Sequence, residues 1–150
     1  MFLLDTNVLS TVIAAQPAPP VAAWMLAQPT TVLFTASVCQ AEIPAGIAVM
    51  PHGRRRENLE TAARAMFEND FAERVLPFDR EAAIAYGDLF AARRRAGRPS
   101  STPDLMIASI ARAKAARVVT RDIGDFEHCG LTVIDPWTAV VNARNFVLLE

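Results

Sequence analysis

The chain has 150 residues, of which 52% are hydrophobic and 21% are charged, and its formal net charge is −1. This length suits one domain with a core of its own, and the high apolar content excludes an intrinsically disordered protein. No run of residues is apolar and long enough to span a membrane, and the opening MFLLD lacks the basic start of a signal peptide. We therefore expect a cytoplasmic protein without a membrane partner.

Along the chain, short apolar runs alternate with longer segments of helical spacing. The expected strands are residues 2–4, 31–35, 75–76, 118–120 and 131–134, and the expected helices are residues 6–13, 21–26, 37–50, 54–69, 79–96 and 101–116. This alternation predicts βαβ units and a mostly parallel sheet. We expect a single α/β domain with a short central sheet flanked by helices.

Polar residues and glycine mark several helix ends. Ser37 and Gln40 match a capping box at the start of the third expected helix. Asp79 can cap the helix that follows it, and Gly97 is typical of the position just after a helix. Ser101 can cap the helix that begins next to it.

Two acidic residues follow expected strands. Asp5 comes directly after residues 2–4, and Asp122 lies just beyond residues 118–120. Binding sites of parallel sheets form outside the carboxyl ends of the strands. If these two strands are parallel neighbours, Asp5 and Asp122 emerge at the same edge of the sheet.

Two further acids lie on expected helices. Glu42 falls in an apolar helical stripe, where an unpaired carboxylate is costly. Asp104 stands three residues after Ser101, where an acid also serves as an ordinary capping residue. Each acid alone has a simple structural explanation as a cap, a turn residue or an ion-pair partner.

Taken together, these four acids predict a divalent metal site. Crowded carboxylates repel one another and raise each other's pKa, and a hard ion such as Mg²⁺ or Mn²⁺ binds carboxylate oxygens. The expected metal ligands are Asp5, Glu42, Asp104 and Asp122.

Four stretches in this order resemble VapC-type PIN domains. They are LLDTNVLS at 3–10, AEI at 41–43 with GI at 46–47, DLMIA at 104–108 and TRD at 120–122. The resemblance implies a PIN-like nuclease domain over residues 1–138, followed by a C-terminal tail, residues 139–150, that is part of the same domain or flexible. Pro44, within the helix of Glu42, and Pro103, next to Asp104, depart from the family pattern.

The resemblance also implies a function and partners. It implies a divalent-metal-dependent endoribonuclease that is the toxin of a type II toxin–antitoxin pair, with a metal-activated water cleaving RNA phosphodiesters. The resemblance makes the same four acids, Asp5, Glu42, Asp104 and Asp122, the catalytic residues. It further implies a small VapB-like antitoxin and a homodimer. Two alternatives are a non-catalytic PIN-like binding module and a haloacid-dehalogenase-like phosphatase. The phosphatase would use Asp5 as its nucleophile and generally needs an acid at the position of Asn7.

On the substrate side, Thr6 and Asn7 adjoin Asp5 and can orient a water or a ligand carboxylate. Between positions 93 and 121 the chain has seven Arg and one Lys against a single acid. The expected RNA contacts in this segment are Arg93, Arg94, Arg95 and Arg98. The alternative for this basic segment is a solvated helix face.

Apolar residues of the expected helices 21–26 and 54–69 leave two interpretations open. They are Trp24, Leu26, Leu59, Met66 and Phe67. They form either a groove for an amphipathic helix of the antitoxin or part of the domain core.

Overall fold

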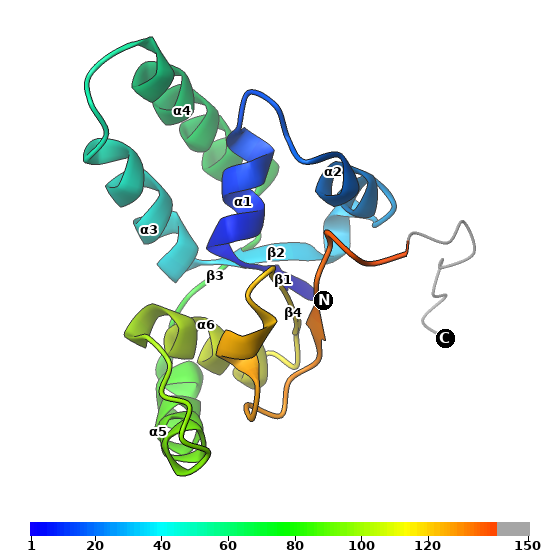
Figure 1. The fold of residues 1–150 in the computed structure, drawn as a ribbon, viewed down its shortest axis with the longest axis vertical. Helices are drawn as coiled ribbons and strands as arrows, with labels where there is room; N and C mark the ends of the chain where they lie inside the picture. Colours follow the sequence, from blue (N-terminus) through cyan, green and yellow to red (C-terminus); the bar gives the residue numbers. More distant parts are fainter. Residues whose placement is uncertain (141–150) are drawn as a thin grey trace.

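A five-stranded parallel sheet forms the centre of the molecule, with the strand order β3-β2-β1-β4-β5 (Figure 1). The computed structural model describes residues 1–140. Its strands are β1 (Phe2–Leu4), β2 (Leu33–Ala36), β3 (Val75–Leu76), β4 (Arg117–Val119) and β5 (Val133–Ile134). Each neighbouring pair is parallel, which confirms the predicted α/β class with a short parallel sheet.

The first strand occupies the middle of this sheet. Leu3 pairs with Phe34 of β2 on one side and with Val118 of β4 on the other. Leu3 and Leu4 are both fully buried, because helices cover both faces of a parallel sheet. The central position of β1 places the residue that follows it, Asp5, between the ends of its two neighbours.

Six α-helices surround the sheet. They are α1 (Thr6–Ile13), α2 (Pro19–Leu26), α3 (Ser37–Ala48), α4 (Arg54–Ala65), α5 (Arg80–Arg95) and α6 (Thr102–Ala113). In the view of Figure 1, α1 to α4 lie above the sheet, with α3 and α4 projecting as an arm, whereas α5 and α6 lie below it. Short helical turns are η1 (Thr30–Val32), η2 (Met66–Asp70) and η3 (Ile123–Phe126).

Three of the predicted helix ends are confirmed. The Asp79 carboxylate accepts a hydrogen bond from the main-chain N of Ala82 at 3.0 Å, and the Ser101 hydroxyl accepts one from the N of Asp104 at 3.2 Å. Gly97, with φ of +68°, follows the end of α5 in the left-handed region that favours glycine.

The predicted capping box at Ser37 is wrong. The N-cap of α3 is Ala36, and no side chain caps this helix. The Ser37 hydroxyl instead accepts a hydrogen bond from the main-chain N of Phe78 at 3.2 Å. This contact ties the start of α3 to the segment that follows β3. The helix also continues through Pro44 without ending there.

Other differences from the sequence-based prediction concern element ends. The expected helix 54–69 changes into a wider π-type turn, η2, after Ala65. The expected helix 101–116 ends at Ala113. The expected tail, residues 139–150, falls mostly on residues 141–150, which lie outside the described residues. Among residues 1–140, no helix has the length and apolar character needed to cross a membrane.

Candidate active site

Asp5 lies at the carboxyl end of β1 and caps α1. Its Oδ1 accepts a hydrogen bond from the N of Thr6 at 2.7 Å, and its Oδ2 accepts one from the Thr120 hydroxyl at 2.7 Å. Its main-chain N donates to the carbonyl of Val119 at 3.0 Å, which extends the pairing of β1 with β4. Only 5% of the residue is exposed, so the carboxylate is fixed in a buried position.

The environment of Asp5 disfavours its charged form. Burial raises the pKa of this carboxyl from 3.8 to about 6, against the lowering effect of its hydrogen bonds from Thr120 and Thr6. The negative charges of Asp104 and Glu42 raise this pKa further. Two of the other predicted site acids therefore lie close enough to act on Asp5 electrostatically.

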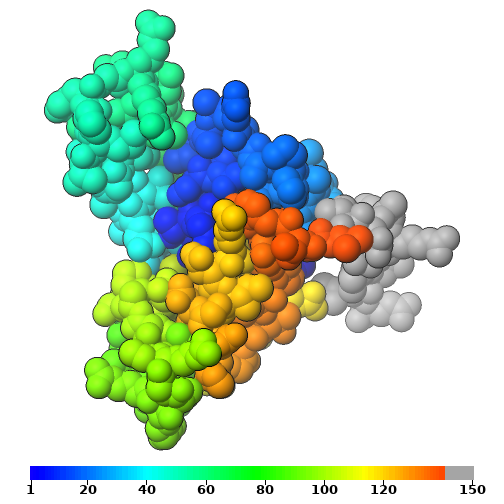
Figure 2. Space-filling view, viewed as in Figure 1, coloured from blue at the N-terminus to red at the C-terminus, as the bar shows by residue number. Residues whose placement is uncertain are grey.

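Glu42 and Asp122 join this group through short polar side chains of α1. The Thr6 hydroxyl donates to Glu42 Oε2 at 2.6 Å. The Asn7 amide donates to Asp122 Oδ2 at 3.0 Å and to the Thr120 hydroxyl at 2.9 Å. These contacts link α1, α3 and the end of β4, and Figure 2 shows the corresponding segments (blue, cyan and yellow) meeting in the middle of the molecule.

Asp104 lies in the first turn of α6, where the Ser101 hydroxyl donates to its Oδ2 at 2.5 Å. Ser101 is the N-cap of this helix, and the charge of Asp104 reaches Asp5. Asp125 of η3 also belongs to this acidic neighbourhood. Burial raises its pKa, and the charges of Asp104 and Asp122 add to this rise.

Sequence reasoning missed one residue of this network, Thr120. Its hydroxyl donates to Asp5 and accepts hydrogen bonds from the Asn7 amide and from the main-chain N of Asp122 at 3.1 Å. The residue is fully buried. Its position between β4 and Asp122 was the available signal, because a polar residue at a strand end faces the site edge of a parallel sheet.

The donor set has the chemistry of a site for a hard divalent ion. None of the ion pairs found within residues 1–140 involves Asp5, Glu42, Asp104 or Asp122. Their partners are neutral hydroxyl and amide donors, so no side-chain cation within residues 1–140 balances the four acids.

The described side chains do not close around an ion by themselves. Over residues 1–140, no three His, Cys, Asp or Glu side chains form a ready-made ligand cage. Mg²⁺ usually keeps several waters and binds through one or two carboxylates. The four acids therefore fit an ion that is held partly through water.

A family model described as "PIN domain" matches residues 2–130. The chain belongs to the PIN-domain family. It is 46% identical over 143 residues to plasmid stability protein StbB of Pseudomonas syringae pv. tomato, covering 93% of this chain and 100% of the relative. It is 39% identical over 137 residues to VapC ribonuclease Y4jK of Sinorhizobium fredii, covering 91% and 98% of the two chains.

A solved structure of FitAB bound to the IR36 DNA fragment has a chain with the same fold. The TM-score is 0.85 at 30% sequence identity, over 93% of this chain and 98% of that one. Together with the family match, this confirms the resemblance seen in the sequence and the expected PIN fold.

The arginines of this PIN domain differ in accessibility. Arg93 is only 3% exposed, and its Nη1 donates to the main-chain oxygens of Gly124 and Glu127 at 2.9 and 2.8 Å. The prediction that Arg93 contacts RNA is therefore wrong, because its donors face the interior. Arg94 and Arg95 are exposed.

Arg98 is exposed as well, and it forms an ion pair with Glu127, with Arg98 Nη1 3.3 Å from Glu127 Oε2.

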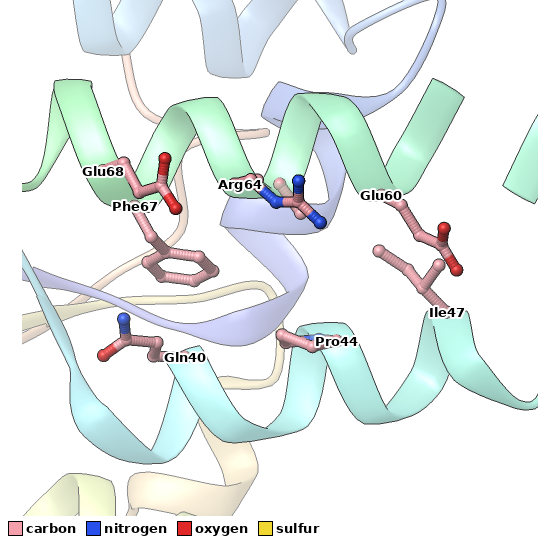
Figure 3. A pocket seen from close by; sticks show the side chains of 8 residues that line it. Gln40, Pro44, Ile47, Glu60, Arg64, Phe67 and Glu68 are labelled. Atoms are coloured by element: carbon pink, nitrogen blue, oxygen red, sulfur yellow. The ribbon is translucent and has the colours of Figure 1, made fainter. Parts of the chain in front are cut away.

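The apolar residues expected to form a groove or part of the core differ in burial. Trp24, Met66 and Phe67 are buried in the core, which confirms the core interpretation for them, whereas Leu26 is 87% exposed. A cavity of about 380 Å³ is instead found between α3 and the continuous segment of α4 and η2 (Figure 3). We call it the α3–α4 cavity, and its lining residues are Gln40, Pro44, Ile47, Glu60, Ala63, Arg64, Phe67 and Glu68.

Proposed function

We propose that this PIN domain is an endoribonuclease, the toxin of a toxin–antitoxin pair, and that it depends on Mg²⁺ or Mn²⁺. The observation that carries the proposal is the convergence of Asp5, Glu42, Asp104 and Asp122, with no balancing cation in the part of the chain that the structure describes. The named function of relatives such as VapC ribonuclease Y4jK supports the same activity. Membership of the PIN-domain family excludes the alternative of a haloacid-dehalogenase-like phosphatase.

The four acids are the proposed metal ligands and catalytic residues. Asp5 and Asp104 would hold the ion directly, and Glu42 and Asp122 would complete the site directly or through water. A divalent ion bound there supplies a water of lowered pKa and neutralises charge on the phosphate. The chain's own contribution is a fixed orientation of the acids.

Two residues of α1 and Thr120, which follows β4, provide this orientation. Thr6 holds Glu42, Asn7 holds Asp122, and Thr120 holds Asp5 by hydrogen bonds. We assign Thr6 and Asn7 to the alignment of ligand carboxylates, which is one of the roles expected from the sequence. Hydrogen-bonded partners of this kind fix the orientation of metal ligands.

RNA is attracted by the exposed arginines near the start of α6. Arg94 and Arg95 in the last turn of α5, and Arg98 just beyond it, are the remaining candidates for phosphate contacts. Contacts of this kind are sequence-independent and weaken as the salt concentration rises. A ribonuclease with such a surface acts where RNA is abundant, and we place it in the cytoplasm.

A small VapB-like antitoxin restrains the toxin. The chain resembles Toxin FitB of Neisseria gonorrhoeae and a VapBC member of the toxin–antitoxin systems from Mycobacterium tuberculosis. We propose the α3–α4 cavity as a docking site for an amphipathic helix of the antitoxin, with apolar contacts to the exposed Pro44 and polar contacts to the exposed Arg64. A homodimer remains part of the proposal on the basis of family resemblance.

Cleavage of an RNA substrate by the purified protein tests the proposed function. We expect cleavage with Mn²⁺ or Mg²⁺, none with a chelator, and none with Asp104→Asn at unchanged circular dichroism. The control is Asp88→Asn, which changes an exposed acid of α5 outside the site. Undiminished cleavage by Asp104→Asn contradicts the assigned metal site, whereas RNA binding without any cleavage favours the non-catalytic binding module.

A further inference from the structure

Arg93 is the only buried basic residue among residues 1–140. No acidic side chain forms an ion pair with it in this part of the chain. Its Nε is also buried and lacks a hydrogen-bond partner within the described residues. Burying a cation without an ion-pair partner costs folding free energy. The two hydrogen bonds that Arg93 forms are therefore its main compensation, and both go to main-chain carbonyls of one short segment.

These two bonds hold the short turn η3 at both of its ends. Arg93 Nη1 donates to Gly124 O at 2.9 Å within η3 and to Glu127 O at 2.8 Å directly after it. Arg93 itself lies in the last turn of α5. One guanidinium group therefore fastens η3 to α5.

The turn η3 continues directly from Asp122. The main-chain N of Asp125 donates to Asp122 O at 3.1 Å, so η3 and Asp122 are joined by a hydrogen bond as well as by the chain. The Asp122 carboxylate accepts a hydrogen bond from Asn7 at 3.0 Å. An uninterrupted set of contacts thus runs from Arg93 through η3 to the acidic site.

The charge of Arg93 acts on the same turn. Burial raises the pKa of Asp125, Asp104 and Asp122 raise it further, and Arg93 lowers it.

Two other contacts fix η3: a hydrogen bond from the Ser100 hydroxyl to Asp125 O at 3.1 Å and the burial of Phe126. Both involve the later part of the turn. Arg93 also binds the carbonyl of Gly124, two residues after Asp122.

We infer that Arg93 is a positioning residue of the acidic site, which fixes η3 against α5 and thereby holds Asp122 at the edge of the sheet beside Asp5. The inference rests on the proposed function, because it concerns the shape of the proposed metal site. Groups that orient metal ligands from outside the ligand set contribute about 10–100-fold to metal affinity.

Titration calorimetry with Mn²⁺ alone tests the inference on purified wild type, Arg93→Met and Arg80→Met. Methionine keeps an unbranched apolar stem and removes every donor. Arg80 is an exposed arginine at the other end of the same helix and provides the matched control. For Arg93→Met we expect a dissociation constant for Mn²⁺ about 10–100-fold higher, and for Arg80→Met an unchanged one.

Hydrogen exchange separates positioning from general destabilisation. Well below the melting midpoint, Arg93→Met should exchange amides 122–127 faster than wild type, with no change in β1. Where the Met variant does not fold, Arg93→Lys takes its place, because lysine keeps the charge but not the two-carbonyl geometry. Wild-type Mn²⁺ affinity in a folded Arg93 variant overturns the inference, whereas a wild type that binds no Mn²⁺ overturns the proposed metal dependence instead.

Discussion

Asp5→Asn should stabilise the metal-free protein at neutral pH. The unfolded carboxyl releases its proton near pH 4, whereas burial holds the pKa of the folded Asp5 at about 6. Between these values the folded state binds more protons than the unfolded state, so its stability falls as the pH rises. Above pH 6 the full loss of folding stability is reached and no longer changes with pH. An asparagine at this position has no carboxyl to ionise, so its folding stability does not fall in this way.

The expected size of the effect follows from the same pKa shift. A rise from 3.8 to about 6 corresponds to roughly 3 kcal/mol at about 1.4 kcal/mol per pKa unit. Asparagine keeps an oxygen for the N of Thr6 but disturbs the bond from Thr120, which costs about 1 kcal/mol. We therefore expect a net gain of about 2 kcal/mol, or roughly 4–8 °C in melting temperature for a domain of this size.

Urea unfolding followed by circular dichroism, with a chelator present, provides the measurement. Wild type should lose stability between pH 4 and 6, and Asp5→Asn should not. Asp88→Asn, at an exposed position of α5, should follow wild type. Added Mn²⁺ should raise the stability of wild type more than that of Asp5→Asn. A variant less stable than wild type at pH 7.5, or one with the wild-type pH profile, would refute this account of Asp5.

Three further outcomes are expected. Replacing Arg94 and Arg95 together by Ala should weaken RNA binding and flatten its dependence on salt in filter-binding assays; an unchanged salt slope assigns both to a solvated surface. Gly97→Ala, at φ of +68°, should lower the free energy of unfolding by about 1–2 kcal/mol. Gly46→Ala, at an exposed helical position with open space around it, should raise it by about 0.5–1 kcal/mol. A Gly97→Ala variant that is more stable than Gly46→Ala contradicts the assigned end of α5. Production of the wild-type chain in bacteria should arrest growth, and co-production of its antitoxin should restore growth; healthy cells containing active, soluble protein contradict the toxin assignment.

The sequence predicted elements whose signals are local. β1 was recognisable as a short apolar run, and α5 and α6 were recognisable because Asp79, Gly97 and Ser101 mark their ends. The acids Asp5 and Asp122 were placed at one sheet edge because parallel strands present their carboxyl ends together. These predictions needed only the chain near each element and the rule for parallel sheets.

The predictions that failed depended on contacts between distant parts of the chain. Ser37 matches a local capping box, yet its hydroxyl binds the N of Phe78, 41 residues away. Arg93 stands in a run of three arginines typical of a solvated surface, yet its partners are carbonyls 31 and 34 residues further on. The role of Thr120 likewise depends on a partner 115 residues away, Asp5. No local pattern contains this information.

The placement of β1 in the middle of the sheet also sets the order in which the residues of the acidic site become available during synthesis. The first strand emerges from the ribosome long before its neighbour β4 and the Asp122 that follows β4. Asn7 and Asp122 are 115 residues apart, a distance that takes roughly 6–23 s to translate at about 5–20 residues per second. Throughout that interval a nascent chain holds part of its acidic site and no complete one.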